Sequence, residues 1–275
     1  MELSIANSAT SAASAFGCGA AQLGMSERNA LGTVLVVAPH ADDESLGCGG
    51  LIALLCDVGQ TVWIVLVSDG ARSHPGSLRY DAAARRDLRE AELRDAASCL
   101  GVPAARVLTM RLSDGALPGP GHADFESAAD SLRAIAETTG CETLLAPWRR
   151  DPHCDHRATS ALARRALECM IAPASGTPPR LLEYLVWVTE RAAPGDLPAA
   201  GEAKVWRVDI RAVQDRKRAA ISAHRSQAGL VITDDPHGFT LSPGMRERAA
   251  APDEYYFEAG TESQDEGAAH QLDMA

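Results

Sequence analysis

Four ionisable side chains lie close together in the chain, directly after a short apolar run at residues 33–38. They are His40, Asp42, Asp43 and Glu44. Like charges held this close repel one another, so one of the carboxylates tends to keep its proton. A divalent cation removes this repulsion, and imidazole nitrogen with carboxylate oxygen is a ligand set that suits zinc.

A second cluster of the same chemistry, His153-Cys154-Asp155-His156, follows another apolar run. Two histidines and one carboxylate are the three protein ligands of a hydrolytic zinc site, which keeps a further position open. A spare carboxylate then acts as the base toward water. Either cluster alone also has a structural explanation, since acidic residues favour helix N-termini and His-x-x-His pairs occur on surfaces. Together, at two predicted strand ends, they favour a metal site.

Apolar runs alternate with amphipathic segments along the chain. Strands are predicted at 33–38, 61–67, 106–110, 142–146, 181–189 and 205–210, and helices at 45–58, 78–100, 124–138, 156–170 and 211–224. This alternation with short connections predicts an α/β, Rossmann-like fold with a mostly parallel sheet and helices on both faces. Polar segments follow the first four strands, at 39–44, 68–74, 112–115 and 147–156. Since the carboxyl ends of parallel strands meet at one edge of the sheet, a single site is expected there.

Composition suggests the boundaries of the domain. Residues 1–30 are rich in alanine, serine and glycine and are predicted to be a flexible N-terminal extension. Residues 31–258 are predicted to form one catalytic domain, and residues 259–275 a disordered tail. The net charge of −11 disfavours a nucleic-acid or anionic-membrane partner.

The cysteines and the apolar runs indicate the compartment. The seven cysteines are scattered without a C-x-x-C pair, which favours reduced thiols and a cytoplasmic protein. No apolar run approaches the ~20 residues of a membrane helix. The first residues lack the pattern of a secretory signal.

The two clusters resemble the signature motifs of the LmbE/PIG-L family of zinc-dependent N-deacetylases. Residues 36–44 are similar to the family's Ala-His-Pro-Asp-Asp-Glu motif, and residues 153–156 to its second motif. The similarity continues through 68–70, Arg89-x-x-Glu92, Glu183-Tyr184 and 217–227, and so covers about residues 30 to 257.

The resemblance implies a role for each residue of the motifs. The implied zinc ligands are His40, Asp43 and His156. Asp42 is implied as the general base that takes a proton from the zinc-bound water. His153 is implied as the residue that stabilises the oxyanion or protonates the leaving amine, with Asp155 orienting its ring.

Five further residues are predicted to bind substrate: Arg89, Asp114, Trp148, Arg149 and His224. The first two match family positions that touch a sugar. The tryptophan is expected to stack on a sugar face and the arginine beside it to hold an anionic group, with packing and solvated charge as alternatives. The histidine is expected at the mouth of the site, and a cation at a helix C-terminus is its alternative explanation.

Two positions depart from the family motifs. Ala41 stands where the family has proline, and Pro39 precedes the histidine instead. Cys154 also replaces a common proline, and is predicted to be a non-ligand thiol rather than a soft metal contact. The glycines at 47, 49 and 50 do not form a dinucleotide motif, because their spacing differs and the carboxylates before them repel phosphate.

The sequence therefore predicts a zinc-dependent enzyme that removes an acetyl group from a small-molecule N-acetylated amino sugar or its glycoconjugate. Ferrous iron suits the same ligands. Two alternatives stay open: a zinc hydrolase of another N-acyl amide in secondary metabolism, and a non-catalytic sugar- or metal-binding protein. Binding alone needs neither Asp42 nor His153, which argues against the last. No pattern in the sequence specifies an oligomeric state.

Overall fold

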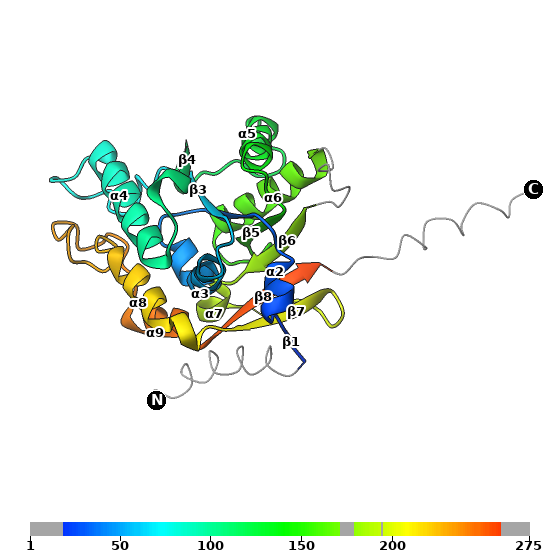
Figure 1. Cartoon of the computed structure of the whole chain (residues 1–275). Helices are drawn as coiled ribbons and strands as arrows, with labels where there is room; N and C mark the ends of the chain where they lie inside the picture. Colours follow the sequence, from blue (N-terminus) through cyan, green and yellow to red (C-terminus); the bar gives the residue numbers. More distant parts are fainter. Residues whose placement is uncertain (1–18, 171–178, 194, 260–275) are drawn as a thin grey trace, which may run out of the picture.

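The computed structural model describes residues 19–170, 179–193 and 195–259 (Figure 1). Its described part contains one eight-stranded sheet in the order β1-β7-β8-β6-β5-β2-β3-β4. The strands are β1 (Ala21–Gln22), β2 (Val34–Ala38), β3 (Val62–Ser68), β4 (Val107–Leu112), β5 (Thr143–Pro147), β6 (Arg180–Tyr184), β7 (Ala203–Asp209) and β8 (Asp253–Ala259). The run from β4 to β6 is parallel, whereas β8 is antiparallel to both of its neighbours.

Helices cover both faces of the sheet. They are α2 (Met25–Asn29), α3 (Asp43–Asp57), α4 (Ala82–Leu100), α5 (Phe125–Thr138), α6 (Cys154–Cys169), α7 (Val188–Arg191), α8 (Gln214–Ala223) and α9 (Pro243–Ala249). Alternate residues of β2 divide between the two faces: Val34 and Val36 pack with α3, α4 and α8, and Leu35 and Val37 pack with α5 and α6. The predicted α/β class with a mostly parallel sheet is confirmed.

The order of the strands places the site. From β2 the chain steps outward through β3 to β4, and from β5 it steps the other way to β6. At such a switch the loops after the two central strands separate and leave a crevice at the carboxyl end of the sheet. The first cluster follows β2 and the second follows β5, so both lie at this crevice.

The structure differs from the sequence-based expectations at three places. The predicted strand over 181–189 ends at Tyr184, and α7 begins at Val188. The described part of the predicted N-terminal extension contains β1 and α2, because β1 pairs with β7 and Leu23 is fully buried. The segment after residue 230, for which no helix or strand was predicted, contains α9 and β8. The rest of the predicted extension (1–18) and the tail from 260 lie outside the described residues.

Helix α3 carries the first cluster and is bent at Cys48, where φ is −141° and ψ is 15°. The buried Glu254 carboxylate of β8 accepts hydrogen bonds from the backbone N–H groups of Gly50 (2.7 Å) and Leu51 (2.9 Å), just after the bend. The buried Lys217 ammonium lies 2.6 Å from the same carboxylate. A carboxylate at the start of the second helical segment satisfies N–H groups that the bend leaves without an intrahelical partner.

None of the described helices combines the length and the apolar composition that crossing a membrane requires.

We expect Gly50→Ala to destabilise the fold, although alanine is normally the better helix former. A Cβ at residue 50 would lie 2.4 Å from Cγ2 of Ile210 and 2.7 Å from its Cβ, so α3 and the residue that follows β7 must move apart. Overpacking of this kind costs about 1–3 kcal/mol in the free energy of unfolding, measurable in urea. The matched control is Gly119→Ala, whose Cβ meets nothing within 4 Å, and should stay within about 0.5 kcal/mol of wild type. A Gly50→Ala protein as stable as wild type would contradict this packing.

Candidate active site

A cavity of about 260 Å³ opens at the carboxyl end of the sheet. Its lining comes from the segments after β2, β3, β4, β5 and β6 and from the segment before and within α9. The lining residues are His40, Asp42, Asp43, Leu46, Arg72, Ser73, Arg89, Asp114, His153, Val186, Trp187, Arg191, Phe239, Leu241 and Met245. The structure thus brings both clusters to one cavity.

The turn from β2 into α3 has a strained backbone. Asp42 precedes the helix with φ 139° and ψ −25°, a conformation that residues with a side chain rarely adopt. Its backbone N–H donates to Glu44 Oε2 (3.0 Å), and the other oxygen of Glu44 lies 2.9 Å from His224 Nε2. Two side chains buried behind the turn therefore hold Asp42 in this conformation.

Three side chains converge on one point below the cavity. Oδ2 of Asp43 lies 3.3 Å from His40 Nδ1 and 3.2 Å from His156 Nε2. Ligands about 2.0–2.1 Å from a tetrahedral zinc are about 3.3 Å apart, so these separations fit a shared ion. His156 is fully buried, and neither of its ring nitrogens makes a hydrogen bond. Its nitrogens lie 3.2 Å from Asp43 Oδ2 and 3.4 Å from Asp151 Oδ1, and an imidazole buried among carboxylates in this way fits the role of a metal ligand.

The ionisation of this cluster follows from its burial and its charges. Burial raises the pKa of Asp43, but His156 and His40 outweigh it and lower that pKa well below its usual range. Burial lowers the pKa of His156, yet Asp43 and Asp151 raise it to about 9. The carboxylate is thus ionised and the histidine protonated. The protons supply the positive charge that a cation supplies in a metal site.

Asp42 and His153 line the cavity beside the cluster of His40, Asp43 and His156. Burial raises the pKa of Asp42 to about 6, against the opposing effect of Arg89, whose Nη2 lies 3.6 Å from Asp42 Oδ1. A carboxylate with a pKa in this range is suited to general-base work near neutral pH. Burial, together with His156 and His40, lowers the pKa of His153 to about 4, so its ring is neutral.

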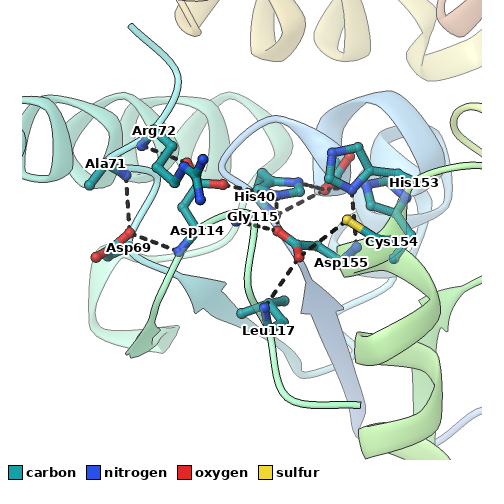
Figure 2. Close-up of polar contacts among 12 residues, drawn as sticks. His40, Asp69, Ala71, Arg72, Asp114, Gly115, Leu117, His153, Cys154 and Asp155 are labelled. Carbon is teal, nitrogen blue, oxygen red and sulfur yellow. Dashed lines mark hydrogen bonds and ion pairs between the residues drawn. The ribbon is translucent and has the colours of Figure 1, made fainter. Parts of the chain in front are cut away.

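The Asp155 carboxylate, which was predicted to orient the His153 ring, contacts His40 in this structure. It lies 3.0 Å from His40 Nε2 and accepts hydrogen bonds from the backbone N–H groups of Gly115 (2.7 Å) and Leu117 (3.3 Å), as Figure 2 shows. The loop after β4 offers these donors, and they draw the carboxylate toward His40. With Nε2 of His40 held by a carboxylate, Nδ1 is left to face Asp43 and the converging point.

The backbone of α6 sets the orientation of His153 instead. Nδ1 of His153 accepts a hydrogen bond from the N–H of Asp155 (3.2 Å), which places the proton of the neutral ring on Nε2. The backbone N–H of His153 donates to Asp151 Oδ1 (2.9 Å), and the N–H of Trp187 donates to Oδ2 of the same residue (3.0 Å). Asp151 is fully buried and also faces His156 Nδ1 at 3.4 Å. Its place between β5 and the second cluster was a signal that the sequence analysis missed.

Two of the predicted substrate-binding residues line the cavity. Arg89 donates to the carbonyl of Ala41 (2.6 Å), the residue that replaces the family's proline. Asp114 accepts from the backbone N–H of Arg72 (2.8 Å), and its other oxygen lies 3.4 Å from His40 Nε2. Burial raises the pKa of Asp114, but His40 and Arg89 lower it to about 2. Arg89 and Asp114 therefore offer opposite charges at the rim of the metal cluster.

The other three residues that were predicted to bind substrate do not line this cavity. Trp148 is fully buried against Phe257, and its indole N–H donates to the carbonyl of Asp196 (2.5 Å). Arg149 lies over the Trp148 ring and pairs with Glu202 at 2.9 Å. His224 is buried behind Glu44. The chain after β5 turns the first two side chains toward β8, and the third supports the turn at Asp42.

Cys154 is exposed, with Sγ 3.8 Å from Asp155 Oδ1. Possible ligand atoms lie within 4.8 Å of one another in three groups of the described residues: His153, Cys154 and Asp155; His40, His153 and His156; and His40, Asp114 and Asp155. The sulfur-containing group and the group of His40, Asp114 and Asp155 are therefore geometric rivals of the set of His40, Asp43 and His156.

The sequence analysis also missed the apolar lining of the cavity. Trp187 fell within a predicted strand, and Phe239 and Met245 fell outside every predicted helix and strand.

Comparisons with known proteins agree on one family. Residues 35–167 match the family described as PIG-L, GlcNAc-PI de-N-acetylase. A 1D-myo-inositol 2-acetamido-2-deoxy-alpha-D-glucopyranoside deacetylase from Rhodococcus jostii is 28% identical, over 91% of this chain and 98% of its own. A probable N-acetyl-alpha-D-glucosaminyl L-malate deacetylase 2 from Bacillus cereus is 29% identical, over 73% of this chain and 86% of its own.

Solved structures share the fold. The N,N'-diacetylchitobiose deacetylase from Pyrococcus horikoshii is 25% identical with a TM-score of 0.56, over 71% of this chain and 70% of its own. A 4-carboxy-2-hydroxymuconate hydratase from Pseudomonas putida is also 25% identical with a TM-score of 0.56, over 72% and 81%. The fold therefore supports more than one reaction, and the site has to decide between them.

We expect the strained backbone at Asp42 to make a glycine variant more stable than an alanine variant, which is the reverse of the usual order in and near helices. Asp42→Gly should be more stable than Asp42→Ala by about 1–2 kcal/mol in urea unfolding of the metal-free protein, because only glycine tolerates this φ without strain. Asp95, which is exposed in the middle of α4, is the control position. There the alanine variant should be the more stable by about 1 kcal/mol. The same order at both positions would show that the turn is unstrained.

Proposed function

Residues 35–167 form a PIG-L family domain, and on that basis we propose that the chain is a metal-dependent N-deacetylase. Its proposed substrate is an N-acetylated amino sugar or the glycoconjugate of one. The relatives named above as deacetylases support the reaction. The observation that carries the proposal is the convergence of His40, Asp43 and His156 beside Asp42 at the floor of an open cavity.

The proposed ligands of the ion are His40, Asp43 and His156, with zinc as the preferred metal and ferrous iron as compatible with the same atoms. Their spacing, and the burial of His156 between the Asp43 and Asp151 carboxylates, support this choice over the sulfur-containing group. A bound divalent ion polarises the amide carbonyl and lowers the pKa of water.

Asp42 performs the proton transfers in this proposal. Its carboxylate takes a proton from the attacking water, and then gives that proton to the amine as the bond between carbon and nitrogen breaks. The products are acetate and the free amino sugar. A pKa of about 6 suits both directions of transfer.

His153 stabilises the charge that develops on the amide oxygen. Because Nδ1 accepts from the Asp155 N–H, Nε2 carries the proton and is the nitrogen that donates a hydrogen bond. A hydrogen bond that strengthens as the oxygen becomes negative lowers the barrier without moving a proton. Arg89 and Asp114 bind the sugar hydroxyls at the rim.

Replacement of Asp42 by asparagine should abolish turnover without loss of the metal. The amide keeps the size of the side chain but cannot accept the proton from water, so acetate release from N-acetylglucosamine compounds should fall by about 10²–10⁴-fold. Metal content, measured by atomic emission, should stay at the wild-type value. Asp95→Asn, an exposed change in α4, serves as the control. An Asp42→Asn enzyme with full turnover would remove Asp42 from the mechanism.

Replacement of His156 by alanine should abolish metal binding. Wild-type protein stripped with a chelator should melt at a lower temperature and recover when zinc is added, since a ligand present at 100 times its Kd stabilises by about 2.7 kcal/mol. His156→Ala should show no such recovery. His122→Ala, at an exposed position before α5, should behave as wild type. Recovery of the His156→Ala protein would place the metal elsewhere.

The remaining hydrolase alternative is a zinc hydrolase that acts on another N-acyl amide. Acetate release from N-acetylated sugars, compared with acid release from N-acylated amines that lack a sugar, separates the two. Zinc-loaded protein that hydrolyses neither class would favour a binding protein.

A further inference from the structure

We propose that the cavity receives an apolar aglycone, attached to the N-acetylated sugar, against a wall of six side chains. This inference rests on the proposed function and adds the chemical class of the substrate. The six residues, called the apolar wall below, are Leu46, Val186, Trp187, Phe239, Leu241 and Met245.

The cavity has two chemically different sides. The metal cluster, Ser73, Asp114 and three arginines (Arg72, Arg89 and Arg191) supply charges and hydrogen-bonding groups. None of the six residues of the apolar wall carries a charge, and their only polar side-chain group is the indole N–H of Trp187. Four of them are more than nine-tenths buried, so the small surface that they keep includes the cavity.

The apolar wall is assembled from distant segments and is held in place. The Trp187 and Phe239 rings meet edge to face with centroids 5.7 Å apart. Asp151 fixes the backbone of Trp187, and the backbone N–H of Phe239 donates to the carbonyl of Ser73 (2.7 Å). Asp234 and Asp235 accept hydrogen bonds from the loop at residues 76–79. These bonds hold the segment that contains Phe239 against the rim of the cavity. A pocket built in this way is preorganised for a ligand.

The apolar wall begins beside the reacting groups. The ring of Trp187 stacks on that of His153, with centroids 6.3 Å apart and 22° between the planes. The Arg191 guanidinium lies over the Trp187 ring, 4.5 Å from its centroid, and places one positive charge at this edge of the apolar wall. A group bonded to a sugar whose acetamide lies at the metal cluster is therefore within reach of these side chains.

The chemistry of the apolar wall selects its occupant. A polyol placed there loses hydrogen bonds with water and finds few new partners, whereas an aromatic or alkyl group loses none. The acetyl methyl group is too small to cover six side chains. The occupant is therefore on the sugar, as an aryl or alkyl aglycone, and not on the acyl side.

The test compares acetate release from phenyl, methyl and inositol glycosides of N-acetylglucosamine, in both anomeric forms. For wild-type enzyme, kcat/KM for the phenyl glycoside should exceed that for the methyl glycoside by at least tenfold, and the inositol glycoside should gain nothing. Phe239→Ala and Met245→Ala should each reduce the phenyl-to-methyl ratio to below threefold. Leu230→Ala changes an exposed leucine outside the cavity and should keep the wild-type ratio.

Each contrary result has its own meaning. Equal turnover of phenyl and methyl glycosides overturns the apolar aglycone while the deacetylase stands. A preference for N-hexanoyl over N-acetyl methyl glucosaminide that depends on Phe239 overturns it too, because it assigns the apolar wall to the acyl chain. If no glycoside releases acetate, the proposed function fails. In that case the affinities for phenyl and methyl N-acetylglucosaminide, measured by calorimetry, test the apolar aglycone on their own. Equal affinities overturn the proposal of an apolar aglycone.

Discussion

Several carboxylates are buried next to three histidines at the edge of the sheet, and the rest of the site depends on how their charges are balanced. Burial by itself raises the pKa of Asp43 and lowers that of His156, yet their mutual contact reverses both shifts. Such a group is stable only if each charge has its partner at the right distance. In the metal-free chain the partners are protons on His40 and His156. The same arrangement, with the protons exchanged for one divalent ion, is the centre of the proposed hydrolase.

Three further carboxylates hold the residues of the site in position through hydrogen bonds. Glu44 holds the strained turn at Asp42, Asp155 holds His40, and Asp151 links the backbone of His153 to that of Trp187. The last link joins the catalytic cluster to the apolar wall. The bend in α3, held by Glu254, is a longer-range part of the same support. The fold therefore positions reactive groups through hydrogen bonds between buried side chains and backbone, as preorganised sites require.

The local pattern of the sequence was enough to predict the parallel core and the place of both clusters. Apolar runs such as Val34–Ala38 form the central strands, and the polar segments after them meet at one edge. Contacts between segments that are distant in the chain could not be predicted from the sequence. Trp148 and Trp187 are both aromatic residues beside a strand end, and only the packing of β8 decides that the first is buried. Likewise, the partner of Asp155 depends on the loop after β4, whose backbone donors have no sequence signature.

The most direct measurement of the central claim is anomalous diffraction at the zinc absorption edge from crystals of the metal-loaded protein. The account predicts one strong peak between His40 Nδ1, Asp43 Oδ2 and His156 Nε2, with each ligand at about 2.0–2.2 Å. A peak at the His153-Cys154-Asp155 group, with a sulfur ligand at about 2.3 Å and an empty buried cluster, would contradict it.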